Sequence, residues 1–111
     1  EGFIIRNSLL RKLFTNEDEH ILGCNFSIHK VLLEKINGFD ENYEGPGLGE
    51  DSDIEYRLRL AGAKFRSVRN LAVQYHLYHS KTKEEEKNMK YFTEVKQSKN
   101  YFCKNGLVKY E

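Results

Sequence analysis

The stretch NGFDENYEGPGLGEDSDIEYRLR, residues 37–59, decides how this chain is expected to fold. It opens with Asn37-Gly38, a pair that favours the end of a helix, because both residues tolerate the left-handed conformation that often follows a last helical turn. A loop rich in glycine and proline comes next, over residues 45–49, and a loop held between two regular elements is a common place for function. The segment after this loop begins with three acidic residues: Glu50, Asp51 and Asp53.

The residues after the loop predict the start of a helix. Ser52-Asp53-Ile54-Glu55 fits a capping box, in which Ser52 is the N-cap and Glu55 is the third helical residue. Gly62 is the expected stop. Asp51 would then lie just before the cap, where the helix dipole favours a negative charge, and an ionised carboxylate there can bind sugar hydroxyls or accept a proton from one. An ordinary acidic helix start is the alternative, and the spacing alone favours it.

The rest of the chain predicts an α+β domain with helices around a few strands. Apolar residues at helical spacing, and a second capping box that begins at Thr82, predict three further helices over residues 4–14, 28–36 and 82–104. Short segments rich in Val, Tyr and Leu, and one segment of looser alternation, predict three strands over residues 21–28, 63–68 and 71–78. Gly23, inside the first of these strands, suggests a close backbone approach.

Length and composition limit the classes of protein that fit. The chain has 111 residues, which is room for a single domain over residues 1–111, and its 18 basic and 17 acidic residues give a net charge of +1. That balance argues against a dedicated nucleic-acid binder, which would carry a basic face. No apolar run approaches the roughly 20 residues of a membrane span, and no signal-peptide pattern is present. We expect a cytoplasmic protein, with peripheral association at the inner face of the membrane as an alternative.

Two further predictions concern single features of the sequence. Cys24 and Cys103 are expected to be reduced rather than joined in a disulfide, and Cys24 is expected to be packed. The charged run over residues 81–90 is expected to be a solvated helix face, with a weak membrane or partner contact as the alternative. Because the sequence begins at Glu1 without a methionine, we also expect it to be a piece of a longer protein.

Five short motifs together resemble a known enzyme family. They are, in order, Gly23-Cys24-Asn25-Phe26-Ser27, Asn37-Gly38-Phe39-Asp40-Glu41, Gly49-Glu50-Asp51-Ser52-Asp53, Arg57-Leu58 and His76-Leu77-Tyr78-His79. Their order and spacing, over about half of the chain, resemble the C-terminal, acceptor-side region of GT-A fold glycosyltransferases. The region is most similar to the one shared by bacterial family-2 glycosyltransferases and the β-1,4-galactosyltransferases. The resemblance implies the C-terminal part of a GT-A fold, with the donor-binding half and its Asp-x-Asp motif outside this chain.

The resemblance also implies roles for individual residues. Asp51 would remove a proton from the acceptor hydroxyl, whose oxygen then attacks the anomeric carbon and expels the nucleoside diphosphate. Glu50 would hydrogen-bond the acceptor sugar, and Asp53 would do the same or support the loop. Gly49 and Asn25 are further substrate-binding candidates, although a purely structural role for Asn25 fits equally well.

His76 and His79 are the predicted metal ligands. Their H-x-x-H spacing lets both imidazoles converge on one ion if the chain turns there. The resemblance implies that they hold Mn²⁺ or Mg²⁺, which neutralises the leaving diphosphate. Two histidines with ordinary hydrogen bonds at the end of a strand are the alternative.

The expected function is the acceptor-binding and catalytic-base part of a metal-dependent inverting glycosyltransferase. It would move a sugar from a nucleotide-sugar donor to a glycan or lipid-linked acceptor in polysaccharide biosynthesis, and the isolated chain is expected to be inactive. A non-catalytic carbohydrate-binding or interaction module of the same fold is the alternative, and a retaining transferase is a third. The galactosyltransferases carry a tryptophan in the glycine loop, whereas this chain has none, which leaves the donor and acceptor sugars open.

Overall fold

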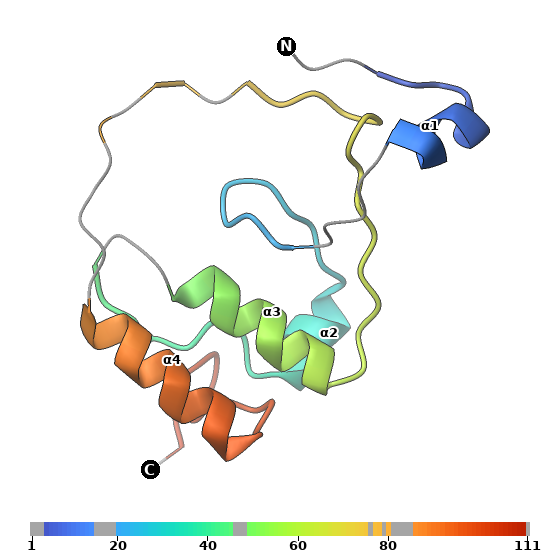
Figure 1. Cartoon of the computed structure of the whole chain (residues 1–111). Helices are drawn as coiled ribbons and strands as arrows, with labels where there is room; N and C mark the ends of the chain where they lie inside the picture. The colour runs from blue at the N-terminus through green and yellow to red at the C-terminus, as the bar shows by residue number, and fades with distance from the viewer. Residues whose placement is uncertain are drawn as a thin grey trace. The chain divides into compact units, whose positions relative to one another are not determined.

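The computed structural model describes residues 4–14, 20–45, 49–75, 77–78, 80 and 86–110. The chain divides into two compact units, a first unit made of Glu1–Glu19 and Phe65–Ser80, and a second unit made of His20–Lys64 and Lys81–Glu111. Its described residues form four helices, which Figure 1 labels: α1 Ser8–Phe14, α2 Lys30–Lys35, α3 Glu50–Leu60 and α4 Glu86–Ser98. No helix in these ranges is both long and apolar enough to cross a bilayer.

The first unit consists of α1 and of extended chain. Asn7 caps α1, because its side-chain Oδ1 accepts hydrogen bonds from the backbone N–H groups of Leu9 at 2.9 Å and Leu10 at 3.2 Å. The backbone N–H of Ile5 donates to the carbonyl of Asn70 at 2.8 Å and joins the two segments of this unit. The helix predicted over residues 4–14 is therefore present but begins only at Ser8.

The predicted strands are not formed. None of the described residues within 21–28, 63–68 and 71–78 is in a strand, and the described chain contains one isolated bridge, between Asn105 and Lys109. Residues 61–68 do alternate between half-buried and exposed, which is the pattern that predicted a strand. The three strand predictions are wrong for this structure because a strand also needs a neighbour to take its hydrogen bonds, and no ladder forms among these residues. The GT-A fold itself stays a prediction.

The end of α2 is set by the Asn37-Gly38 pair, as predicted. Asn37 has a left-handed backbone, with φ of 64°. The N–H of Gly38 donates to the carbonyl of Leu33 at 2.8 Å, and the N–H of Asn37 donates to that of Glu34 at 3.1 Å. These two bonds are those of a Schellman motif, which satisfies the last carbonyls of a helix and stops it.

The start of α3 differs from the predicted capping box. The helix begins at Glu50, with Gly49 at the N-cap and no side-chain cap, so Ser52 lies inside the first turn. The carbonyl of Gly49 accepts the first helical bond, from the N–H of Asp53 at 2.7 Å. Gly49 can take this place because its φ of 154° is open to glycine and not to serine. The stop at Gly62, with φ of 84°, agrees with the prediction.

The last helix, α4, is shorter than predicted. It ends at Ser98 rather than near residue 104, because Lys99 turns into a left-handed conformation with φ of 52°. The predicted capping box at Thr82 lies outside the described residues. The α4 helix packs on α3, where the rings of Phe92 and Tyr56 meet edge to face with centroids 6.2 Å apart.

The core of the second unit is small. Its buried apolar side chains are Ile36, Ile54, Leu58 and Cys103. No disulfide joins the two cysteines, as predicted. The prediction that Cys24 is packed is wrong, because this side chain is exposed, and with no strand at residues 21–28 it has no sheet face to pack against.

Candidate functional site

The chain at residues 20–23 lies along one face of α3, and it turns over residues 22–25. Asp51 and Glu55, one helical turn apart, each accept a backbone N–H from this segment. The N–H of Gly23 lies 3.3 Å from Asp51 Oδ2, and the N–H of Ile21 lies 2.8 Å from Glu55 Oε2. The spacings match because two residues of extended chain cover about the same length as one turn of helix. Two carboxylates on α3 therefore hold the start of the motif Gly23-Cys24-Asn25.

Asp51 is half-buried in the first turn of α3. Besides its bond from Gly23, it accepts the N–H of Ser52 at Oδ1 over 2.7 Å, and the Ser52 hydroxyl lies 3.4 Å from the same oxygen. A Cβ atom added at Gly23 would lie 3.5 Å from Asp51 Cβ and Oδ2, which is ordinary van der Waals contact with a side chain. The close backbone approach predicted at Gly23 is therefore not found. Asp51 is thus anchored through both oxygens at a helix start, where negative charge is favoured.

The other predicted substrate-binding residues lie in different environments. Glu50 is exposed at the start of α3, and Asn25 is exposed, with its backbone N–H bonded to the carbonyl of Leu22 at 2.8 Å. Gly49 is buried beneath the ring of Tyr43, where an added Cβ would lie 2.5 Å from Tyr43 Cδ1. Glu50 and Asn25 are therefore open to a ligand, whereas Gly49 supports the backbone from which the helix begins.

Asp53 supports the structure from inside the second unit. Its side chain has no exposed surface, and Arg57, which is 1 % exposed, contacts Asp53 Oδ2 through Nη2 at 2.6 Å and Nε at 2.7 Å. Arg57 also donates from Nη1 to the carbonyl of Ile36 at 2.8 Å. A carboxylate in this position cannot reach an acceptor in this conformation. Asp53 was considered either as a ligand of the acceptor sugar or as a support of the loop. Its buried geometry fits the second role.

The surroundings of Asp53 shift several pKa values. Burial raises the pKa of Asp53, and the hydrogen bond and charge of Arg57 offset this only in part. Burial and the neighbouring Asp53 carboxylate raise the pKa of Tyr43 above its usual range. Burial, with the hydrogen bond that the Tyr91 hydroxyl donates to Asp40 Oδ2 at 2.9 Å, raises the pKa of Tyr91 to about 12. Both tyrosines are therefore neutral at physiological pH.

Comparison with protein families shows which family the chain belongs to. Residues 9–80 match the family model described as the N-terminal domain of galactosyltransferase, and this range is more than half of the chain. The chain belongs to this galactosyltransferase family. Comparison with curated proteins and with solved structures gives no match.

The match refines the resemblance found in the sequence. It supports a galactosyltransferase-like glycosyltransferase, and it includes Gly23, Asp51 and both predicted metal ligands. The matched family is described as an N-terminal domain, so the expected placement in the C-terminal half of an enzyme is corrected. The finer relationship to bacterial family-2 enzymes stays a prediction.

The predicted metal site of this galactosyltransferase-family domain lies outside the described structure. Neither His76 nor His79 is among the described residues. Within the ranges that are described, no group of three or more His, Cys, Asp or Glu side chains is placed to hold a metal ion. The described side chains therefore do not form a metal shell by themselves, and the ligand assignment rests on sequence alone.

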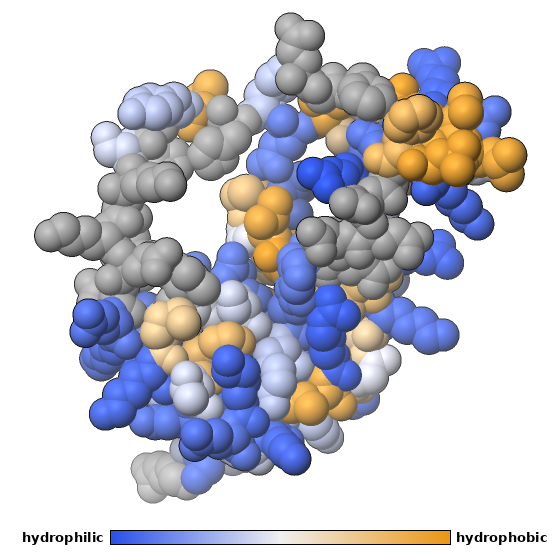
Figure 2. Space-filling view, viewed as in Figure 1, coloured by the Kyte–Doolittle hydropathy of each residue, from blue (hydrophilic) through white to orange (hydrophobic). Residues whose placement is uncertain are grey.

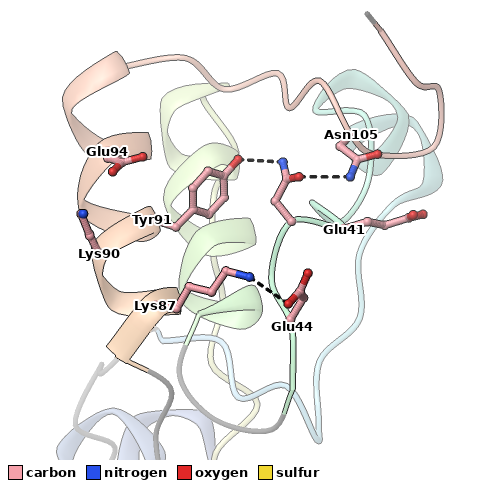
Figure 3. A pocket seen from close by; sticks show the side chains of 8 residues that line it. Glu41, Glu44, Lys87, Lys90, Tyr91, Glu94 and Asn105 are labelled. Carbon is pink, nitrogen blue, oxygen red and sulfur yellow. Dashed lines mark hydrogen bonds and ion pairs between the residues drawn. The ribbon is translucent and has the colours of Figure 1, made fainter.

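Sequence reasoning missed an open groove of about 530 Å³ in the second unit. Figure 3 shows that residues from three separate segments line it: Glu41, Asn42, Glu44, Lys87, Lys90, Tyr91, Glu94 and Asn105. Asn42 links its walls, because it donates to the Tyr91 hydroxyl at 2.9 Å and accepts from Asn105 Nδ2 at 3.2 Å. Lys87 pairs with Glu44 at 2.9 Å. No local pattern signals this groove, since its members lie up to 64 positions apart along the sequence.

Two of the interactions at α3 were also missed. Glu55 was predicted to close a capping box, but it instead bonds Ile21 and lies 2.9 Å from Nδ1 of His20. The His20 side chain is 71 % exposed despite this contact. No signal in the local sequence predicts the pairing, because the two partners are 34 and 35 positions from Glu55.

Proposed function

We propose that this galactosyltransferase-family domain supplies the acceptor-binding surface and the general base of an inverting sugar transfer from a nucleotide sugar to a glycan acceptor. The placement of Asp51 carries the proposal. Its carboxylate is half-buried at the start of α3 and is held through both oxygens by Gly23 and Ser52. A held carboxylate next to an exposed polar segment suits a group that must meet one hydroxyl in one orientation.

The proposed step moves one proton and one sugar. An ionised carboxylate can accept about four hydrogen bonds, so the bonds from Gly23 and Ser52 leave Asp51 able to accept another from the acceptor hydroxyl. The proton passes to Asp51 as the acceptor oxygen forms its bond to the anomeric carbon. The bond between that carbon and the diphosphate oxygen breaks, and the nucleoside diphosphate leaves. Glu50 and Asn25, both exposed, are proposed to orient the acceptor sugar.

A divalent ion is proposed to neutralise the leaving diphosphate, with His76 and His79 among its ligands. This part of the proposal is supported by the H-x-x-H spacing in the sequence. In the full-length enzyme, His76→Ala and His79→Ala should each weaken activation by Mn²⁺ or Mg²⁺. An unchanged metal titration in both variants would remove the two histidines from the ligand set.

The test of the base is Asp51→Asn in the full-length enzyme. The amide keeps the shape of the side chain and cannot take a proton, so turnover of a nucleotide sugar should fall about 100- to 10,000-fold. Affinity for the nucleotide sugar should be retained, and Glu34→Gln, an exposed change on α2, should leave turnover unaltered. Near-normal turnover of Asp51→Asn would reject the base assignment. A wild-type protein that binds glycans but never releases nucleoside diphosphate would favour the alternative of a non-catalytic binding module.

A further inference from the structure

The open groove of the second unit, between α4 and residues 41–44, is lined almost entirely by polar side chains. Its volume of about 530 Å³ lies within the roughly 300 to 1,000 Å³ of small-molecule sites. Such sites are usually lined by apolar and aromatic side chains, but seven of the eight residues that line this groove are charged or carry an amide. Figure 2 shows that the visible surface of α4 is mostly hydrophilic. This α4 groove therefore suits a polar ligand.

A buried carboxylate holds two of the lining side chains in place. Asp40, which is 5 % exposed, accepts the Tyr91 hydroxyl at Oδ2 over 2.9 Å and the Asn42 amide at Oδ1 over 2.8 Å. Figure 3 shows Tyr91 reaching from α4 toward Asn42, which in turn accepts a hydrogen bond from Asn105. Because these side chains are fixed before a ligand arrives, little conformational entropy is lost when one binds.

The walls of the α4 groove keep polar groups that a ligand can use. A primary amide has two N–H donors and an oxygen with two lone pairs. Asn105 donates one N–H to Asn42, and its side-chain oxygen has no partner among the residues that the structure describes. Lys90 and Glu94 line the same groove, and neither forms an ion pair with a described residue.

The charges around the α4 groove nearly cancel. Three carboxylates and two lysines line it, and Lys87 pairs with Glu44 at 2.9 Å. Lys109, just outside the lining, pairs with Glu41. Phosphate is commonly bound by arginine or by N–H groups at the start of a helix, and no arginine is among the eight lining residues. A nucleotide or an anionic polymer would thus gain little here, so a neutral ligand is favoured.

We propose that the α4 groove binds neutral sugar residues of a glycan chain. A pyranose ring carries hydroxyl groups around its edge and C–H groups on its faces, so it needs hydrogen-bonding side chains beside a flat apolar surface. Asn105, Lys90 and Glu94 offer the hydrogen bonds. The ring of Tyr91, half-buried against that of Tyr43, offers the flat surface. A peptide fits less well, because the lining offers no apolar pocket for its side chains.

The α4 groove shares no residue with the proposed transfer site. None of Asp51, Glu50 and Asn25 lines it. Binding of a glycan there needs neither a nucleotide sugar nor a base, so the inference goes beyond the proposed function.

The experiment titrates the chain with neutral trisaccharides and follows its backbone amide signals by nuclear magnetic resonance. The probes are cellotriose, maltotriose and chitotriose, and trigalacturonate is the anionic control. At least one neutral probe should shift the signals of Asn42, Tyr91 and Asn105 to saturation. We expect a Kd of about 1 mM, because only a few exposed hydrogen bonds hold the sugar. Trigalacturonate should bind no more tightly.

Variants of the exposed, unpaired lining residues test the contacts. Lys90→Ala and Glu94→Ala should each weaken binding about three- to tenfold, as expected for one lost hydrogen bond. Glu86→Ala and Lys96→Ala are the matched controls, because both side chains are exposed on α4 outside the groove lining, and they should bind like the wild type. Tyr91→Leu should weaken binding about tenfold or more. Circular dichroism will verify that each variant keeps its helices.

The outcomes separate a neutral glycan from other ligands. No saturable shift with any of the neutral probes would overturn the proposal, as would equal losses in Lys90→Ala and Glu86→Ala. Tighter binding of trigalacturonate that weakens with salt would assign the α4 groove to an anionic ligand and also overturn it. Shifts confined to residues around Asp51, with the groove signals unmoved, would overturn this inference and leave the proposed acceptor site standing.

Discussion

Arg57 and Asp53 form a buried ion pair one helical turn apart on α3, with Arg57 Nη2 and Nε at 2.6 and 2.7 Å from Asp53 Oδ2. The same guanidinium reaches the carbonyl of Ile36, just after the last turn of α2, at 2.8 Å. A single arginine thus connects the helix that carries Asp51 to the helix before it. Since neither charge is accessible to water, each depends on the other for its solvation.

Removing one member of this pair should strongly destabilise the second unit. Arg57→Met leaves the Asp53 carboxylate buried and unpaired, and we expect a loss of about 3 to 5 kcal/mol in the free energy of unfolding. The matched control is Arg59→Met, whose side chain is 43 % exposed and pairs with Glu55, with an expected loss of about 0 to 1 kcal/mol. Urea denaturation of both variants makes the comparison. Combining Asp53→Leu with Arg57→Met should recover much of the lost stability, because no buried charge is then left unpaired. Equal losses in Arg57→Met and Arg59→Met would contradict the buried pair.

Asn37 should be the residue that holds the C-terminal segment in place. Its side chain donates to the carbonyls of Cys103 at 2.8 Å and Val108 at 2.7 Å, and accepts the N–H of Val108 at 2.8 Å. Asn37→Gly keeps the left-handed backbone but loses these three bonds, so we expect a loss of about 2 to 4 kcal/mol, at about 1 kcal/mol a bond. Asn37→Ala should lose roughly a further 1 kcal/mol because alanine is strained at positive φ.

Hydrogen exchange gives the local readout for Asn37. The N–H of Leu107 donates to the carbonyl of Asn37 at 2.8 Å, so its exchange should accelerate in both variants. The N–H of Ala61, the C-cap residue of α3, donates to the carbonyl of Arg57 and should keep its protection relative to global unfolding. Unchanged exchange at Leu107 would mean that the backbone contact holds the segment without the Asn37 side chain.

Glu55 should make the second unit sensitive to acid. Burial alone would raise its pKa, but the hydrogen bonds from the N–H of Ile21, from Arg59 and from His20 hold the pKa below the ordinary value of 4.5. A carboxyl whose pKa is lower in the folded state stabilises the fold above its unfolded pKa. This contribution disappears as pH falls through the folded value. The loss should therefore begin near pH 4.5 and be complete below the folded pKa.

The measurement compares unfolding free energies of wild type and Glu55→Gln at pH 7 and near pH 3. The two proteins should differ at pH 7, and the difference should shrink on acidification. Glu44 is the control, because its pKa is also lowered, by Lys87, but its side chain is 72 % exposed and screened by water. Glu44→Gln should show a much smaller effect of pH. A difference at Glu55 that stays constant with pH would contradict the role of its charge.

Local signals in the sequence predicted local structure well. Asn37-Gly38 ends α2 because the stop needs only one left-handed residue and bonds to the preceding turn. The start of α3 was missed by three residues because Gly49 and Ser52 are both acceptable N-caps, and the packing of Gly49 under Tyr43 favours the first.

The long-range contacts could not be predicted. Glu55 bonds to His20 and Ile21, and Asn37 bonds to Val108, although these partners lie 34 to 71 positions apart in the sequence. No rule of sequence spacing predicts such pairs. The same holds for the core position of Asp53, because an acidic residue in a first turn is ordinarily exposed. Its partner Arg57 is visible at helical spacing, but the burial of both depends on the packing around them.

Gly49 should be more important to the placement of Asp51 than its size suggests. A Cβ at Gly49 would lie 2.5 Å from Tyr43 Cδ1 and the backbone is at a φ of 154°, so Gly49→Ala must displace the ring or the start of α3. We expect a loss of about 2 to 5 kcal/mol from overpacking and backbone strain together. Gly62→Ala is the matched control: its φ of 84° is also positive, but no atom lies within 4 Å of an added Cβ. Its loss should be only about 1 to 2 kcal/mol.

If the contact with Tyr43 is the cause, Tyr43→Ala should lessen the effect of Gly49→Ala in a double-mutant cycle. Additive losses would assign the whole effect to the backbone instead.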